Sequence, residues 1–435
     1  MGEPPRLRST TTKDRVRGYI FCGLVLFSVI LGSFYILTPC LIFMFLHEGI
    51  WKHLVDKVIG SWLLVPVSFI EYFYGTRVTV TGEKITPNEP ALIIMNHRTC
   101  LDWLFFWNVL YQMDPWLLTT EKICLKKALK FLPGAGWAMC CAAFIFLERS
   151  FKNDVHHISE VIRYYANSGR KYQLLLFPEG TDKCPRSSEK SRLYAEKHGL
   201  RQYSYVLHPR TSGFVHIVSE MRKRNYIKYI YDVTVAYNDA IVQTEIEFFR
   251  DGACPKDVHC NIEKIPIEDV PESREELNNW LKKLWEKKEE QLDKFYNNLD
   301  SASRSLSKDS NSKAVQTTTC IRVLSLLVVT LWMLFTAEAV YIFLSHPSHI
   351  LLGMFTASFF ILTQYRYGGM EYFMIDLANK GKEAISPRLD SVSELSRSDS
   401  VLLSICEVCP SFTDMNIPCF SCRHGLNKLS AFFNL

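Results

Sequence analysis

The chain lacks a strong excess of charge of either sign. Its 50 lysine and arginine residues against 45 aspartate and glutamate residues leave a formal charge of +5 over 435 residues. A protein that binds nucleic acid through its phosphates needs a concentrated positive field. No zinc-finger, basic-zipper or aromatic RNA-platform motif is present either. We therefore do not expect nucleic acid as a partner.

The chain also lacks the pattern of a small secreted disulfide protein. Its 14 cysteines are scattered through apolar segments of a long, aromatic-rich sequence, whereas disulfide frameworks belong to short, loop-rich chains. We expect reduced thiols on the cytosolic side and no metal in a catalytic site. Near the C-terminus a zinc site stays open as the alternative to a disordered tail, with the candidate ligands Cys406, Cys409, Cys419, Cys422 and His424.

No charge interrupts the apolar run from Tyr19 to Leu46, which is longer than the ~20 residues a helix needs to cross a bilayer. It also exceeds the apolar core of a signal peptide, about 7–15 residues. A basic segment, residues 1–18, precedes it and predicts a cytosolic N-terminus. The next run, Val58 to Phe73, contains Pro66 and could be a bent crossing, a re-entrant segment or an interfacial helix.

A second apolar region, Ile321 to Leu344 and Ile350 to Tyr365, predicts a helical membrane hairpin, with two buried core helices as the alternative. Paired crossings at both ends would return the middle of the chain to the cytosol. The predicted segments are a basic N-terminus (1–18), N-terminal membrane helices (19–74), a catalytic domain (75–300), a linker (301–320), a membrane hairpin (321–366) and a disordered tail (367–435).

The middle of the chain has the pattern of an α/β domain. Short runs of β-branched and aromatic residues alternate with helical patterns, and six of them are predicted strands: RVTVTG, ALIIMNH, CCAAFIFLER, YQLLLFPEG, SYVLHPR and DVTVAYN. Their nearly continuous apolar character is typical of strands buried on both faces. We expect a mostly parallel sheet covered by helices, with ligands bound beyond the carboxyl ends of the strands.

Two further patterns predict helices. Lys122, Lys126 and Lys130 recur every four residues and would form one basic helix face, open to solvent or in contact with CoA phosphates or anionic headgroups. Apolar residues from Trp280 to Phe295 repeat at helical spacing between lysines and glutamates, which predicts an amphipathic helix packed on the domain.

His97 and Asp102 are the candidate catalytic pair. Positions five apart on a regular helix are rotated by roughly 140°, so His97 should lie on the turn after a strand and Asp102 in the first turn of the next helix. There the carboxylate can accept the imidazole N–H and stabilise the protonated ring. A helix cap beside an ordinary turn histidine is the plain alternative.

Other candidate site residues follow the remaining predicted strands. Arg149 is suited to bidentate phosphate recognition. The turn formed by Glu179, Gly180 and Thr181 contains a glycine, which would let the acceptor approach the backbone closely. Each has a structural alternative: Arg149 could pair with a carboxylate, and Glu179 could cap a loop or start a helix. Pro209 and Arg210 complete the predicted substrate-binding set, although Pro209 could serve turn geometry alone.

These blocks resemble those of the glycerolipid acyltransferases related to 1-acylglycerol-3-phosphate acyltransferase. NHRTCLD is similar to the family's first block, with Thr99 where serine is usual, and AAFIFLER, FPEGT and VLHPRTSGF are similar to its second, third and fourth. EKICLKKALKFLPGAGW and AEKHGLRQYSYVLHPRTSGF are most similar to the branch that acylates lysocardiolipin and lysophosphatidylinositol. The tail after about residue 380 lies outside the resemblance.

The resemblance implies transfer of an acyl group from acyl-CoA to a lysophospholipid hydroxyl in the endoplasmic reticulum membrane, with acyl-CoA as co-substrate and no cofactor. A lipid hydroxyl needs a base as it attacks the thioester, and His97 is that base by hypothesis. No serine stands in a nucleophile-elbow motif, which favours direct transfer. A CoA-independent transacylase and a non-catalytic membrane scaffold are the alternatives. Acceptor headgroup, acylated position and oligomeric state stay open.

Overall fold

A computed structural model describes residues 10–307 and 317–383 of the chain. Its centre is a seven-stranded sheet in the order β1-β7-β6-β2-β5-β3-β4. The strands are β1 (Arg77–Gly82), β2 (Ala91–Met95), β3 (Glu121–Lys126), β4 (Ile145–Leu147), β5 (Gln173–Leu176), β6 (Tyr229–Tyr237) and β7 (Asp257–Pro266).

The sheet is mostly parallel, which confirms the predicted fold class. Five of the neighbouring pairs run parallel, and only β6 and β7 pair antiparallel. The strands β2 and β5 are buried along their whole length, all five residues of the first and all four of the second, and they are apolar except for Gln173. This burial on both faces explains why these strands were readily predicted from the sequence.

Three strand assignments differ from the prediction. β3 and β7 were not expected, because the alternating lysines of EKICLK and the mixed polarity of DVHCNIEKIP obscure the apolar pattern. SYVLHPR was predicted as a strand, and this was wrong. Its backbone N–H groups at residues 204–206 donate to the Glu289 carboxylate and that of Leu207 donates to Glu179, so side chains replace a neighbouring strand.

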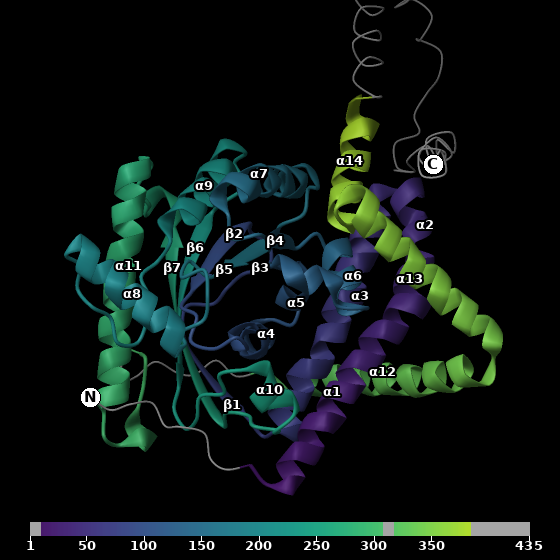
Figure 1. Ribbon diagram of the computed structural model, residues 1–435, viewed down its shortest axis with the longest axis horizontal. Helices are drawn as coiled ribbons and strands as arrows, with labels where there is room; N and C mark the ends of the chain where they lie inside the picture. The colour runs from purple at the N-terminus through teal and green to yellow at the C-terminus, as the bar shows by residue number, and fades with distance from the viewer. Residues whose placement is uncertain (1–9, 308–316, 384–435) are drawn as a thin grey trace, which may run out of the picture.

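Helices cover both faces of the sheet. Figure 1 shows α7 (Phe151–Asn167) and α9 (Thr211–Lys223) on one side and α4 (Asp102–Met113) on the other. The predicted amphipathic helix is α11 (Arg274–Asn297), which packs its apolar side on the domain and buries Leu281 and Trp285 completely. The shorter helices are α5 (Leu117–Thr120), α6 (Ala135–Cys141), α8 (Pro185–His198) and α10 (Glu245–Phe249).

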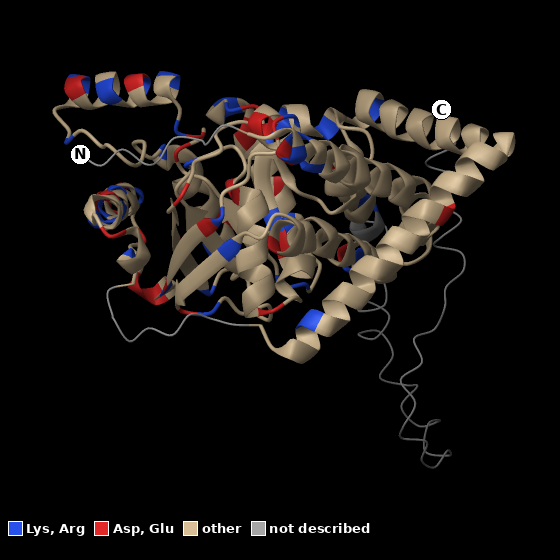
Figure 2. Ribbon diagram, turned by 90° about the horizontal axis from the view of Figure 1, so that it is seen from below, with Lys and Arg blue, Asp and Glu red and all other residues tan. Residues whose placement is uncertain are grey.

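Long apolar helices lie on the side of the molecule away from α8 and α11, and charged residues are sparse along them (Figure 1 and Figure 2). Among the described residues, three helical spans are long and apolar enough to cross a membrane. The first, Thr12–Leu46, comprises α1 (Thr12–Gly32), a π-helical turn and α2 (Thr38–Leu46). The second, Glu48–Phe73, begins as α3 (Glu48–Ser68), and the third is α12 (Thr319–Ser345). They indicate membrane association. α13 (Pro347–Tyr367) follows α12 after a sharp turn at His346.

The predicted basic helix face does not exist. Lys122 lies in β3, where its ammonium is buried 2.8 Å from the Asp56 carboxylate of α3. Lys130 is buried in an ion pair with Glu371, and only Lys126 is exposed. The four-residue spacing was misleading because the segment changes from strand to a 3-10 turn, Lys127–Phe131, between these lysines.

Part of the predicted disordered tail is folded. Helix α14 (Met370–Glu383) packs on α6, α7 and α13, and its apolar side chains Met370, Phe373, Met374, Ile375 and Leu377 are buried. These residues supply the apolar surface that a disordered segment would lack. The candidate zinc ligands from Cys406 to His424 lie outside the described residues.

Candidate active site

His97 and Asp102 lie together at the carboxyl end of β2. β2 ends at Met95 and α4 begins at Asp102, so the histidine lies on the strand-exit turn and the aspartate in the first helical turn, as the spacing predicts. The Asp102 carboxylate accepts a hydrogen bond from His97 Nδ1 at 2.9 Å. This fixes the proton on Nδ1, and no described group bonds Nε2, which is left as the basic nitrogen.

The Asp102 carboxylate is enclosed by donors, and its side chain is 0% exposed. Its Oδ2 accepts the Thr99 backbone N–H at 3.0 Å as well as His97. Its Oδ1 accepts the Tyr237 hydroxyl at 2.5 Å and the Thr99 hydroxyl at 3.3 Å. These hydrogen bonds hold the carboxylate in one orientation and stabilise its charge. Burial and the negative charge of Asp102 raise the pKa of Tyr237, so this hydroxyl stays a donor.

Sequence reasoning did not single out Tyr237. It ends β6, the strand beside β2, and its register with β7 shows that it belongs to the sheet rather than to a loop. A tyrosine at the carboxyl end of a buried strand beside the histidine strand is the signal that could have found it.

The Glu179 side chain is buried behind the His97 backbone and does not face the substrate side of the site. Its carboxylate is buried and accepts three protein N–H groups at 3.2 Å, from the His97 and Leu207 backbones and the Trp285 indole. These bonds join the β2 exit, the loop before α9 and helix α11. Burial is the main cause that raises the pKa of Glu179 to about 7, while His97 and the N–H donors act against it.

The turn after β5 supports the imidazole. Phe177 stacks on the His97 ring with the centroids 4.2 Å apart. The Lys183 backbone N–H donates to the His97 carbonyl at 2.8 Å. The histidine is therefore held through its ring, its N–H and its carbonyl, which limits the positions that Nε2 can occupy.

The Glu179-Gly180-Thr181 and Pro209-Arg210 segments meet. The Arg210 backbone N–H donates to the Pro178 carbonyl at 2.7 Å, and the Arg210 side chain packs over Gly180, where a Cβ atom would lie 3.1 Å from it. Gly180 has φ of +73°, a left-handed conformation that favours glycine. Thr181 is half-buried, and its hydroxyl bonds Asp182 at 3.4 Å.

Arg149 is at the same edge of the sheet but farther from the histidine. β5 and β3 separate β2 from β4, so three strand spacings place the two exits roughly 14 Å apart. Arg149 is exposed, has φ of +65°, and has no ion pair among residues 10–307 and 317–383. The adjacent Glu148 instead pairs with Lys127.

Two cationic residues that the sequence did not single out adjoin His97: Arg98 follows it in the chain, and Lys183 contacts it through its backbone, while the Lys183 ammonium donates to the Ser188 hydroxyl at 3.0 Å. Arg98 donates to the Lys183 carbonyl at 3.1 Å and the Gln243 side chain at 3.3 Å, both neutral oxygens. Burial and the nearby Arg98 charge lower the pKa of Lys183. In the part of the chain that the structure describes, neither side chain forms an ion pair, and no group of acidic, histidine or cysteine side chains could hold a metal.

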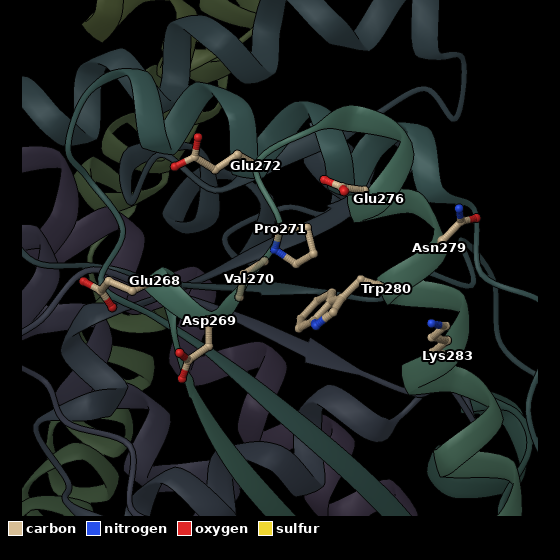
Figure 3. A pocket seen from close by; sticks show the side chains of 9 residues that line it. All are labelled: Glu268, Asp269, Val270, Pro271, Glu272, Glu276, Asn279, Trp280 and Lys283. Carbon is tan, nitrogen blue, oxygen red and sulfur yellow. The ribbon is translucent and has the colours of Figure 1, made fainter.

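A groove lies at the opposite edge of the sheet. It has a volume of about 630 Å³ and is lined by acidic residues, Trp280 and Lys283, from the end of β7 to the start of α11 (Figure 3). β7 ends beside Tyr229, the first residue of β6, whereas the His97 site lies where β6 ends. This groove is therefore separate from the histidine site.

Comparison with known families identifies the class. Residues 77–238 match the acyltransferase family model and residues 251–332 match the model described as the acyltransferase C-terminus. The chain belongs to the acyltransferase family, and it is an enzyme of acyl transfer. His97, Asp102, Arg149, Glu179 and Arg210 all lie within the first matched region.

The most informative relatives are long matches. The chain is 39% identical over 385 residues to the lysophosphatidylinositol acyltransferase 10 of Caenorhabditis elegans, covering 86% of this chain and 97% of that one. It is 38% identical to the mouse lysocardiolipin acyltransferase 1, with coverage of 80% and 90%, and 43% identical over 280 residues to the chicken protein of that name, with coverage of 64% and 73%.

Proposed function

We propose that the chain is a membrane-bound enzyme that transfers an acyl group from acyl-CoA to a free hydroxyl of a lysophospholipid, with His97 as the general base. The observation that carries the proposal is the His97–Asp102 pair, in which the carboxylate holds Nδ1 and leaves Nε2 without a protein partner among the described residues. Arg149, Gly180, Thr181, Pro209 and Arg210 remain the predicted substrate-binding set, whereas Glu179, also predicted to bind substrate, is enclosed beneath His97.

The reaction balances with these groups alone. His97 Nε2 takes the proton of the acceptor hydroxyl as its oxygen attacks the thioester carbonyl, and Asp102 stabilises the resulting imidazolium. When the tetrahedral intermediate collapses, the new C–O ester bond stays, the C–S bond breaks and the imidazolium returns the proton to the CoA sulfur. Cys100 is not a competing nucleophile, because burial raises the pKa of its thiol, which donates to the Gln243 carbonyl.

Cations beside the base support an anionic acceptor. Arg98, which follows His97, and Lys183, whose backbone contacts it, have no carboxylate partner among the described residues, and Arg210 is exposed over the Gly180 turn. Lysophosphatidylinositol and lysocardiolipin, after which the relatives are named, both carry phosphate. We infer an acceptor of this class. Glu179, which is enclosed, would act on such a substrate only by holding the His97 backbone.

The proposed location is the endoplasmic reticulum membrane, with the catalytic domain on the cytosolic side, where acyl-CoA is available. The basic segment before the first apolar helix supports this orientation. The three apolar helices support attachment to a membrane, and with a cytosolic N-terminus the proposed side requires the segment Glu48–Phe73 to bring the chain back to the cytosol.

The test is an assay of membranes that contain the protein. Labelled acyl-CoA is offered with lysophosphatidylinositol, monolysocardiolipin and neutral lysophospholipids, and products are resolved by headgroup and positional isomer. We expect label in an anionic phospholipid, complete dependence on acyl-CoA, and loss of transfer in His97→Ala with the protein still in the membrane. Transfer from a phospholipid donor without acyl-CoA would support a transacylase instead.

A further inference from the structure

An exposed apolar segment lies between the strand-end edge and the long apolar helices. It is Phe131-Leu132-Pro133, here called the apolar lip, which begins at the last residue of the 3-10 turn after β3. Phe131 is 63% exposed and Leu132 46% exposed, although the neighbouring Lys130 and Gly134 are buried. Because the residues on both sides of this segment are buried, its backbone is held in place, and the exposure of its large apolar side chains marks an interaction surface.

The lip is held on both sides by the apolar helices. Before it, Lys130 Nζ donates to the Gly368 carbonyl at 3.0 Å, just beyond α13, and pairs with Glu371. After it, Gly134 packs on α1, and its carbonyl accepts the Ser33 hydroxyl at 3.3 Å. With φ of +72°, and with Ile30 at 2.9 Å from where a Cβ would lie, Gly134 leaves no room for a side chain.

The next helix continues the same contact. The Trp137 ring of α6 stacks on Phe360 of α13, with the centroids 4.9 Å apart and the planes within 3°. Figure 1 shows α6 between the strands and the long helices. The lip is thus continuous with a surface whose outward side chains on α13 are also apolar: Ile350, Leu351, Met354, Phe355, Ile361 and Leu362.

The strand register places the lip at the edge that carries His97. β2, β5 and β3 pair in parallel, with Ile93 beside Leu175 and Leu175 beside Ile123. β2, β5 and β3 end at Met95, Leu176 and Lys126, so their exits lie at one edge of the sheet, two strand spacings or about 10 Å from first to last. Lys126 and Arg149 are exposed near this edge, while Lys127 pairs with Glu148, so the group carries a net positive charge that suits an anionic lipid surface.

We propose that the apolar lip inserts into the lipid interface, so that the strand-end edge faces the bilayer and receives the acceptor without the lipid leaving the membrane. The occupant is a lipid surface, because the lip continues the apolar helices and is bordered by cations. The membrane contact itself goes beyond the proposed function, while its kinetic consequence rests on that function.

The first test separates membrane presentation from chemistry. Full-length Phe131→Ser/Leu132→Ser protein in phosphatidylcholine vesicles should lose roughly tenfold or more in kcat/KM for a long-chain lysophosphatidylinositol in those vesicles. With a short-chain, monomeric lysophosphatidylinositol in detergent it should stay within about twofold of wild type. The control is Leu193→Ser/Tyr194→Ser on α8, which exposes apolar side chains on the side away from the long helices.

Equal losses with both acceptors would overturn the proposal, since the lip would then be part of the folded site. An unchanged rate with vesicles would overturn it too. A second measurement does not depend on activity: p-benzoyl-phenylalanine in place of Phe131 should crosslink to phosphatidylcholine in intact vesicles, and in place of Tyr194 it should not. If Phe131 crosslinks to lipid but the wild-type protein transfers no acyl group, the membrane contact of the lip would be supported and the proposed function contradicted.

Discussion

Two buried pairs of ionisable side chains in this molecule have similar geometry and different consequences. His97 lies 2.9 Å from Asp102, and Lys122 lies 2.8 Å from Asp56. Tyr172 completes the second pair by donating to Asp56 at 2.9 Å, and nothing there is left to react. The His97 ring keeps a nitrogen without a protein partner in the described chain and is 15% exposed. The distance between the partners does not identify the reactive pair, whereas a partly exposed basic nitrogen at the strand ends, without a protein partner among the described residues, does.

Asp102→Asn should produce the largest change on the catalytic side of this comparison. The amide cannot stabilise an imidazolium, and it can hold the ring in the wrong tautomer. We expect kcat to fall on the order of 10²–10⁴-fold. Acyl transfer at saturating acyl-CoA measures it, with the thermal midpoint of the same preparation as the control for folding. A rate near that of wild type would show that Asp102 only caps α4.

Lys122→Met should break the other pair without touching the chemistry. Removal of one partner leaves the Asp56 charge buried, which costs about 3–5 kcal/mol of stability. Thermal unfolding in detergent should show the loss, and Asp56→Leu combined with Lys122→Met should recover most of it. If Lys122→Met instead left stability intact and abolished transfer, the division between structural and catalytic pairs would be wrong.

Glu121 is a buried carboxylate whose hydrogen bond is to Trp107, at 2.9 Å, rather than to a cation. Burial raises its pKa from 4.5 to about 8 in the folded chain. Between these values the unfolded state releases a proton that the folded state keeps, so stability should fall as the pH rises. Glu121→Gln should flatten this part of the curve of thermal midpoint against pH. The same slope in the variant would assign the effect to another group.

Tyr237→Phe should have the smallest effect and the most specific one. It removes the hydroxyl that donates to Asp102 Oδ1 and leaves the ring in place. A hydrogen bond to a charged group contributes about 1.5–3 kcal/mol, so kcat should fall by at most roughly 10–150-fold. The loss should disappear in an Asp102→Asn background, because the hydroxyl acts through that carboxylate. Additive losses in the double variant would contradict this.

The predictable parts of the site were those encoded in short segments. The strand-exit turn and helix start of NHRTCLDW place His97 and Asp102 within one local motif, so spacing and helix electrostatics were sufficient. The partners that complete the site come from distant strands and helices: Tyr237 from β6, Lys183 from the turn after β5, and Trp285 from α11. Their positions depend on strand order, which no local pattern contains.

The same limit explains the misassigned segments. Lysines in EKICLK read as a solvated helix because charge is rarely buried, and only the folded chain reveals Asp56 beside Lys122. SYVLHPR has the composition of a strand, but the Glu289 and Glu179 carboxylates satisfy its N–H groups. The apolar character of the long helices was evident from the sequence, whereas the contacts of α14 with α6 and α7 were not.

The most direct test of the central claim is the pH dependence of acyl transfer by wild type and His97→Ala, measured with labelled acyl-CoA and lysophosphatidylinositol. We expect a loss on the order of 10²–10⁴-fold in the variant and a residual rate that rises with hydroxide concentration, because no side chain then accepts the proton. A His97→Ala rate within about threefold of wild type, with an unchanged pH profile, would contradict the assignment of His97 as the base.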